Sequence, residues 1–218
     1  MKLTANIIGA TGLVGKQLVH LLLNDDNFTK VRIFVRRDSG IHHAKLEQQI
    51  IDFENEKSWA GILTGDVLFS ALGTTLKQAG SKEKEYEVDF IFNLNFAKKA
   101  KENGIENYVL ISSIGANSKS RFFYTRMKGE LDEAVSNLQF RNLTILRPSS
   151  LTGNRQGKRL VEIITIPAIK FLTRFMLKKY RPIKDVTVAK AMINAVLKPD
   201  REKEIWEGDE IFHLAGEK

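Results

Sequence analysis

A tyrosine and a lysine four positions apart are the first residues whose types and spacing could do chemistry. Tyr124 precedes Lys128 in the stretch FFYTRMKGE, and this spacing places both side chains on one face of a helix. A phenol can donate a proton to a carbonyl oxygen, but its reference pKa of about 10 is high for exchange near neutrality. A neighbouring ammonium favours the phenolate, so such a pair suits carbonyl reduction or the reverse alcohol oxidation.

The spacing alone does not separate catalysis from coincidence, because Tyr180 and Lys184 repeat it. Pro182 lies between those two residues and breaks the helical register. No serine-bearing strand end precedes the second pair at a similar distance. We therefore interpret Tyr180 and Lys184 as a chance repeat.

Two serines upstream of Tyr124 strengthen the first pair. Ser112 and Ser113 follow the apolar run YVLI, which is typical of a strand. A serine hydroxyl at a strand end could orient and polarise a substrate carbonyl. We predict Ser112, Ser113, Tyr124 and Lys128 as the catalytic set. The alternative is that Tyr124 and Lys128 only share a half-exposed helix face.

These residues need a scaffold, and the alternation of short β-branched runs with helical periods predicts one. The expected fold class is α/β: a Rossmann-type doubly wound parallel sheet with helices on both faces, forming a single domain over residues 1–218. Strands are expected near 3–9, 31–35, 49–53, 66–71, 107–112, 143–147 and 211–214. Helices are expected at 13–24, 55–61, 86–103, 124–137, 160–178 and 186–197.

The first expected strand runs into a glycine-rich turn, GATGLVG, followed by a helix. Gly9 suits the tight turn, Gly12 lets the backbone approach a pyrophosphate, and Gly15 lets the helix lie close to the strand. The free amides of the helix N-terminus would face the phosphates. The alternative is a plain strand-to-helix turn. We predict a dinucleotide-binding turn made of Gly9, Ala10, Thr11, Gly12, Leu13, Val14 and Gly15.

Later strand ends extend the cofactor prediction. The second strand ends at Arg36 and Arg37, where an acidic residue would favour NAD and an arginine suits the 2′-phosphate of NADP. Two solvated arginines are the alternative. Asp52 and Phe53 could flank the adenine, and small residues at the fourth strand end leave room for the cofactor. These are Leu72, Gly73 and Thr74.

Taken together, GATGLVG, the serine pair, YTRMK and LRPSSL resemble a short-chain dehydrogenase of the atypical or extended kind. The phrases FVRR, LGTTLKQAG and KGE resemble the branch that contains the Tat-interacting protein. The resemblance covers nearly the whole chain and implies a Rossmann-type fold, NADP(H) in preference to NAD(H), and the serine, tyrosine and lysine named above as catalytic residues. It also implies that Lys128, Pro148 and Ser149 lie near the nicotinamide, and that residues 149–184 cover the substrate.

The net charge of +8 belongs to one segment. Residues 155–184 hold nine basic residues and one acidic residue, so the rest of the chain is neutral. The segment could be a core-facing helix with a solvated basic face, part of a pocket for an acidic substrate, an oligomer contact, or a membrane-surface helix interrupted by Pro167. No recognised nucleic-acid motif accompanies the charge. We expect no nucleic-acid partner and no membrane association.

Composition and targeting signals limit the remaining options. The chain has no cysteine, which fits a reducing compartment. It has neither a secretory signal nor an apolar run of 18 residues, so we expect a cytoplasmic protein. The four histidines show no metal-ligand spacing, and no metal is expected.

Two functions remain at this stage. One is an NADP(H)-dependent oxidoreductase that acts on a carbonyl or alcohol substrate. The other is an NADPH-binding regulator that signals through a protein partner with little turnover. A homodimer is compatible with either. The intact serine, tyrosine and lysine favour the enzyme, since a pure sensor does not need them.

Overall fold

The computed structural model describes residues 2–152, 180–200 and 204–217. Among these residues, one sheet has seven parallel strands in the order β3-β2-β1-β4-β5-β6-β9. Its strands are β1 (Leu3–Ile8), β2 (Phe28–Val35), β3 (Leu46–Ile50), β4 (Val67–Ser70), β5 (Asn107–Ile111), β6 (Asn142–Arg147) and β9 (Ile205–Glu207). The predicted Rossmann-type α/β fold is confirmed.

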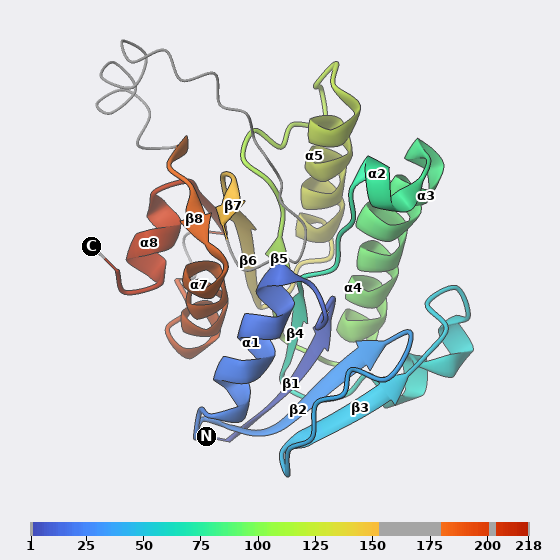
Figure 1. The fold of residues 1–218 in the computed structure, drawn as a ribbon, viewed down its shortest axis with the longest axis vertical. Coiled ribbons are helices and arrows are strands. Elements are labelled where there is room, and N and C mark those ends of the chain that lie inside the picture. The colour runs from blue at the N-terminus through green and yellow to red at the C-terminus, as the bar shows by residue number, and fades with distance from the viewer. Residues whose placement is uncertain (1, 153–179, 201–203, 218) are drawn as a thin grey trace.

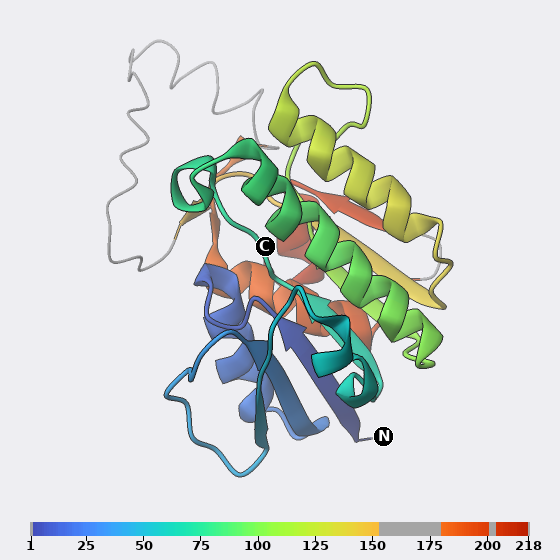
Figure 2. The ribbon, with the colours of Figure 1, turned by 90° about the vertical axis from the view of Figure 1, so that its right-hand side faces the viewer.

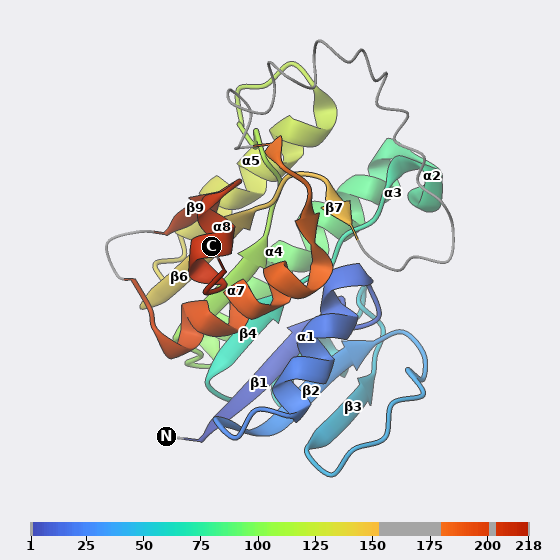
Figure 3. The ribbon, with the colours of Figure 1, turned by 60° about the vertical axis from the view of Figure 1, so that its left-hand side comes forward.

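Helices cover both faces of the sheet. α1 (Leu13–Leu23), α7 (Asp185–Leu197) and α8 (Glu210–Leu214) pack on one face, where α1 and α7 run side by side (Figures 1 and 3). α4 (Phe92–Glu102) and α5 (Phe123–Ser136) cover the other face (Figure 2). The five inner strands, β1, β2, β4, β5 and β6, are therefore largely buried on both sides, which explains their apolar runs.

Short elements complete the described fold at the edges of the sheet. The helices α2 (Leu76–Ala79) and α3 (Lys82–Tyr86) follow β4, and a π-helical turn at Glu87–Ile91 leads into α4. Two 3₁₀ turns, Glu56–Ser58 and Ala60–Ile62, follow β3. A separate pair of short parallel strands joins β7 (Leu151–Thr152) to β8 (Ile183–Lys184).

The bounds of several elements differ from the sequence prediction. The third strand ends at Ile50 rather than near residue 53, because the chain turns away at Asp52, whose backbone oxygen accepts hydrogen bonds from Asn55 N and Ser58 Oγ. The helix expected at 86–103 begins earlier, at Lys82, because the Ser81 hydroxyl accepts a hydrogen bond from the Lys84 amide. The helix expected at 55–61 is replaced by the two 3₁₀ turns.

The late strand expected at 211–214 is wrong. That run forms the helix α8, and the last strand is β9, from Ile205 to Glu207. Ile211 is fully buried with the residues of α7. Short apolar runs do not distinguish a strand from a buried helical turn. In β9 only Ile205 and Trp206 are apolar, and they lie between charged residues, so this strand has no clear sequence signal.

The helix expected at 160–178 and most of the substrate-covering segment 149–184 lie outside the described residues. The second tyrosine–lysine pair is described in full. Tyr180 precedes β8, and Lys184 ends that strand. The pair therefore does not share a helical face, as the intervening proline predicted. In the described part of the chain, no helix is long and apolar enough to cross a membrane.

Candidate functional site

The glycine turn between β1 and α1 is as tight as its sequence predicted. Gly9 has a φ of +79°, and a Cβ there would lie 2.3 Å from the backbone of Ala71 in the next strand end. A Cβ on Gly15 would lie 2.1 Å from the Gly9 oxygen. Only glycine fits at either position. α1 begins directly after Gly12 and has no acidic residue in its first turn, so its N-terminus favours an anion.

A substitution tests this close packing. Gly15→Ala is expected to lower the free energy of unfolding by about 1–3 kcal/mol, because the methyl group must displace backbone rather than a side chain. Gly61→Ala is the matched control, since a Cβ there meets nothing within 4 Å. Urea denaturation of both variants measures the difference. Equal stability of the two variants would contradict the packing described for Gly15.

A large cavity opens beside this turn, with a volume of about 1300 Å³. Pockets of about 300–1,000 Å³ hold drug-sized ligands, so this cavity is large enough for a dinucleotide. The lining comes from the glycine turn, the ends of β2, β3 and β4, the helices after β4, and α7. The lining residues are Gly9, Thr11, Gly12, Leu13, Lys16, Gln17, Arg36, Ile51, Asp52, Phe53, Glu54, Ala71, Leu72, Gly73, Thr74, Gln78, Ala79, Lys84, Glu87, Val88, Phe92 and Asp185.

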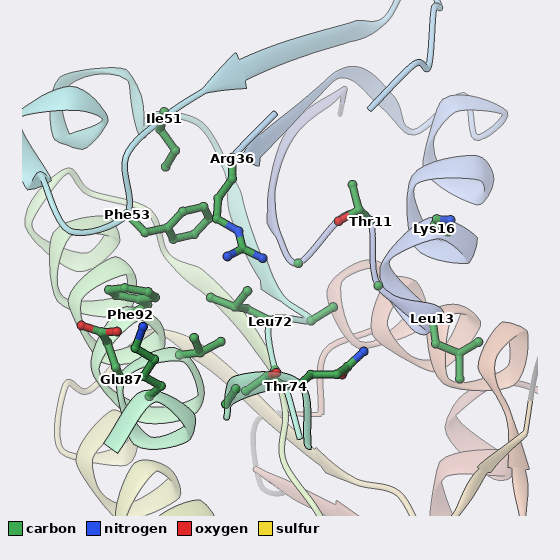
Figure 4. Close-up of a pocket in the computed structure, with 18 of the residues that line it drawn as sticks. Thr11, Leu13, Lys16, Arg36, Ile51, Phe53, Leu72, Thr74, Glu87 and Phe92 are labelled. Atoms are coloured by element: carbon green, nitrogen blue, oxygen red, sulfur yellow. The ribbon is translucent and has the colours of Figure 1, made fainter. Parts of the chain in front are cut away.

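The two arginines after β2 are separated by the structure. Arg36 lines the cavity, and Figure 4 shows its side chain pointing inward beside the ring of Phe53. Arg37 is exposed and does not line the cavity. Both residues lie in the bend that follows β2, and only Arg36 faces the cavity.

The wall opposite the glycine turn is anchored in the core. Phe53 is 8% exposed, and its ring centroid lies 5.6 Å from that of Phe92 and 5.5 Å from that of Phe96. Asp52 is exposed, and one of its carboxylate oxygens accepts a hydrogen bond from the Glu54 amide at 3.0 Å. Phe53 is thus a rigid apolar surface at the cavity edge, with a carboxylate next to it.

The charges around the cavity are mixed rather than uniformly positive. Its lining contains three basic and four acidic side chains: Lys16, Arg36, Lys84, Asp52, Glu54, Glu87 and Asp185. The phosphates of a dinucleotide therefore need individual positive groups close to them, because the cavity as a whole is not positive. The N-terminus of α1 and the guanidinium of Arg36 are the described groups placed to do so.

The loop after β4 is held in place from behind by polar groups of the helical segment 82–102. Thr74 donates its amide hydrogen to Asp89 Oδ2 at 2.6 Å. Asn93 is fully buried, donates to the Leu72 oxygen at 3.4 Å and accepts a hydrogen bond from the Ser70 hydroxyl. This stretch of the cavity wall is therefore fixed by two side chains that the sequence analysis did not assign to the site.

The catalytic lysine predicted from the sequence is deeply buried. Lys128 is 3% exposed, and its Nζ lies 2.7 Å from Asp89 Oδ1. Burial alone disfavours the ammonium, but the Asp89 carboxylate, with Tyr124 and Asp132, outweighs that cost and holds the pKa of Lys128 above its usual value. Lys128 is thus a fixed positive charge.

Tyr124 lies next to this charge at the surface. Its side chain is 40% exposed, and Lys128 Nζ is 5.9 Å from the centroid of its ring. Both residues belong to α5, one turn apart. The structure therefore brings the two together as the spacing predicted, with the phenol accessible and the ammonium beneath it.

The serines lie at the end of β5, on a loop that packs against α5. The Ser112 hydroxyl is buried near the Asp132 carboxylate, whereas Ser113 is half-buried. The Asn117 amide donates to the Thr125 oxygen at 2.9 Å. A Cβ on Gly129 would lie 2.2 Å from the Ser118 nitrogen. The glycine of the KGE phrase therefore permits the serine loop to lie against the tyrosine helix.

A second buried ion pair lies behind Lys128. Asp132, one turn further along α5, is 2% exposed and binds Arg147 Nε at 2.8 Å. Burial raises the pKa of Asp132, and its neighbours Ser112, Arg147 and Lys128 offset only part of that effect. The spacing of four between Lys128 and Asp132 was a sequence signal for placing Asp132 near the lysine, but no sequence signal pointed to Arg147.

The predicted site residues fall into two groups. Those that line the cavity are Gly9, Thr11, Gly12, Leu13, Arg36, Asp52, Phe53, Leu72, Gly73 and Thr74. Those that do not are Ala10, Val14, Gly15, Arg37, Ser112, Ser113, Tyr124, Lys128, Pro148 and Ser149. Ala10 and Val14 are buried beneath the turn. The predicted catalytic set thus lies outside the cavity lining, and Asp89 links Lys128 to the cavity wall at Thr74.

No group of three histidine, cysteine, aspartate or glutamate side chains among the described residues could hold a metal ion.

Pro148 and Ser149 follow the end of β6. Pro148 accepts a hydrogen bond from the Ile114 amide at 3.0 Å, and the Ser149 hydroxyl donates to the Arg181 oxygen. Pro148 thus joins the end of β6 to the loop after β5, Ser149 joins it to the C-terminal part, and neither residue lines the cavity.

Comparison with known proteins agrees with this architecture. A family model described as NAD(P)H-binding matches residues 9–199. The chain belongs to this NAD(P)H-binding family. It is 36% identical over 221 residues to the mitochondrial protein fmp52 of Emericella nidulans, covering 92% of each chain. It is 38% identical over 157 residues to FMP52 of Saccharomyces cerevisiae, covering 70% of this chain and 68% of the relative.

Solved structures confirm the fold of this NAD(P)H-binding protein. A UDP-N-acetylglucosamine 4-epimerase from Methanobrevibacter ruminantium matches with a TM-score of 0.70 and 17% identity, covering 98% of this chain and 81% of that one. A short-chain dehydrogenase/reductase superfamily protein from Agrobacterium tumefaciens, with bound NAD, matches with a TM-score of 0.66 and 15% identity, covering 91% and 75%. At these identities the likeness shows the fold alone.

Two sequence predictions change with these findings. The resemblance to the Tat-interacting-protein branch is not confirmed, because the relatives are Fmp52 proteins. The prediction of a cytoplasmic protein is wrong, because these relatives are named as mitochondrial proteins. The sequence reasoning had relied on the absence of recognised targeting patterns, which carries little weight against relatives that cover most of the chain.

Proposed function

We propose that the protein is an NADP(H)-dependent oxidoreductase of the short-chain dehydrogenase type. Its substrate would be a carbonyl compound or the matching alcohol. Tyr124 acts as the acid–base group, Lys128 supplies the adjacent positive charge, and Ser113 or Ser112 holds the substrate oxygen. One observation carries this proposal: a charged, buried lysine lies under an accessible tyrosine, beside the wall of the cavity.

The residues present fit a dinucleotide. The glycines of the turn have no Cβ, so the backbone there stays accessible to a ligand. The N-terminus of α1 favours phosphate. Arg36 reaches into the cavity from the end of β2, and a guanidinium in this place suits a 2′-phosphate better than a free hydroxyl. These features support NADP(H) in preference to NAD(H).

The residues around Tyr124 account for the proton chemistry. A nicotinamide cofactor, when bound, supplies or accepts the hydride. The partly exposed Tyr124 phenol can donate a proton to a substrate oxygen from solvent-accessible space. The fixed ammonium of Lys128 stabilises the phenolate that remains. Ser113, half-buried at the end of β5, or Ser112 would donate a hydrogen bond to the same oxygen.

A second function is favoured by a different observation. None of the four predicted catalytic side chains lines the cavity, and the charge of Lys128 is already neutralised by Asp89. A protein that binds NADPH and signals through a partner, without turnover, would have no need of a catalytic set inside the cavity. The Tat-interacting-protein branch and a substrate-covering role for residues 149–184 also stay proposals.

Isotope transfer separates the two functions. The protein is incubated with NADPH that carries deuterium at the transferable position and with a panel of aldehydes and ketones. The oxidoreductase predicts deuterium on the carbinol carbon of at least one product alcohol, detected by mass spectrometry, and no transfer with Lys128→Met. NADPH binding without deuterium transfer to any member of the panel would favour the regulator.

A further inference from the structure

The buried face of the segment 82–102 begins with three polar residues, Glu85, Asp89 and Asn93. Asp89 is 1% exposed and Asn93 is fully buried, and they continue along the same face into Phe96, Ala97 and Ala100. The π-helical turn at Glu87–Ile91 contains Asp89. Turns of this kind are frequent at functional sites, and a carboxylate on a core face is costly unless it is paired.

The carboxylate of Asp89 bridges two parts of the molecule. Its Oδ1 lies 2.7 Å from Lys128 Nζ on α5, and its Oδ2 accepts a hydrogen bond from the Thr74 amide at 2.6 Å. A Cβ on Gly73 would lie 3.1 Å from Oδ1. Thr74 and Gly73 line the cavity. One carboxylate therefore contacts both the buried lysine and the cavity wall.

No other described carboxylate is placed to replace Asp89. Asp132 also acts on Lys128, but its Oδ2 binds Arg147 at 2.8 Å. Burial and the Asp89 carboxylate raise the pKa of Glu85, on α3, which disfavours its charged form. Ion pairs buried this deeply often add little stability over well-packed apolar side chains. A stability role alone therefore does not account for the pair.

We propose that Asp89 is a positioning residue that fixes the Lys128 ammonium beside the cavity and ties it to the loop at Gly73 and Thr74. This inference rests on the proposed function. An ammonium has three donors, and Asp89 uses one of them. Lys128 does not itself line the cavity, so its remaining donors would meet hydroxyl groups of a dinucleotide at the edge of the cavity, beside the wall that Asp89 holds. Asp89 and Lys128 then act on the cofactor as one unit.

A double-mutant cycle tests this unit, with NADPH affinity as a readout that needs no turnover. Asp89→Asn keeps an acceptor for the Thr74 amide but removes the charge that holds Lys128, and Lys128→Met removes the ammonium. Each single variant is expected to weaken NADPH binding by about tenfold, in the range of coupling between contacting residues. The double variant is expected to match Lys128→Met alone.

Dissociation constants come from NADPH fluorescence titration, and kcat and KM are measured on any substrate found by isotope transfer. Asp89→Asn is expected to lower kcat while leaving KM for the carbonyl substrate unchanged. Lys99→Met, which removes an ion pair from the outer face of α4, is the matched control and should leave the NADPH dissociation constant within about twofold of wild type.

Two results would overturn the inference. One is a further several-fold loss of NADPH affinity when Asp89→Asn is added to Lys128→Met, because the two residues would then act independently. The other is Asp89→Asn binding NADPH as tightly as wild type. If Asp89→Asn does not fold, the comparison of the double variant with Lys128→Met still decides, since neither leaves an unpaired buried lysine. A wild type without turnover would end the oxidoreductase proposal but leave the binding cycle valid.

Discussion

Replacing Tyr124 with phenylalanine is expected to lower kcat by about 10²- to 10⁴-fold, the range for loss of a general acid. The variant loses only the hydroxyl group. Tyr124 is 40% exposed and belongs to neither buried cluster, so the fold should not depend on it. The NADPH dissociation constant is expected to stay within about twofold of wild type, because removing an interaction made only in the transition state leaves ground-state binding unchanged.

Tyr180→Phe is the matched control for this prediction. Tyr180 is 54% exposed and also precedes a lysine by four residues, but it lies next to β8 rather than on a helix with that lysine. Steady-state rates and NADPH titrations are measured for both variants. Equal rates for Tyr124→Phe and wild type would remove Tyr124 from the chemistry and favour the regulator.

The second large effect concerns cofactor choice. Arg36→Ala is expected to weaken NADPH binding by about 10- to 100-fold, the loss typical of a hydrogen bond to a charged group. NADH binding should change little, because NADH lacks the 2′-phosphate that the guanidinium would contact. Arg36 points into the cavity beside Phe53 (Figure 4). Fluorescence titration of both cofactors measures the change in preference.

The neighbouring Arg37 provides the control. It has the same charge and is the next residue after Arg36 beyond the end of β2, but it does not line the cavity. Arg37→Ala should therefore leave the ratio of NADPH to NADH affinity within about twofold of wild type. A loss of NADPH affinity equal to that of Arg36→Ala would mean that the effect is long-range electrostatics rather than contact with the phosphate.

Much of the fold could be predicted from the sequence because its signals are local. The glycine turn, the apolar strands and the long helical periods each identify an element within a few residues of its true bounds. Parallel strands joined by helices then leave few topologies. The gathering of strand ends at one edge follows from the same rule, so ten of the cavity residues between Gly9 and Thr74 could be predicted before any coordinates, whereas Lys16, Gln17 and others in that range could not.

The missing parts depend on contacts between distant segments. The pairing of Asp89 with Lys128 joins residues from two helices, and only the spacing of polar residues at 85, 89 and 93 along one helix face hinted at it. The separation of Arg36 from Arg37 depends on the direction in which the chain leaves β2. The short apolar run of α8 predicts a strand, whereas packing against α7 makes it a helix.

A crystal structure of the protein with NADP⁺ bound tests the central claim most directly. The account predicts that the adenosine 2′-phosphate contacts Arg36, that the pyrophosphate meets the glycine turn, and that the nicotinamide ribose lies within hydrogen-bonding distance of Lys128, with the ring next to Tyr124. A nicotinamide directed away from α5, with Lys128 still held by Asp89 alone, would contradict it.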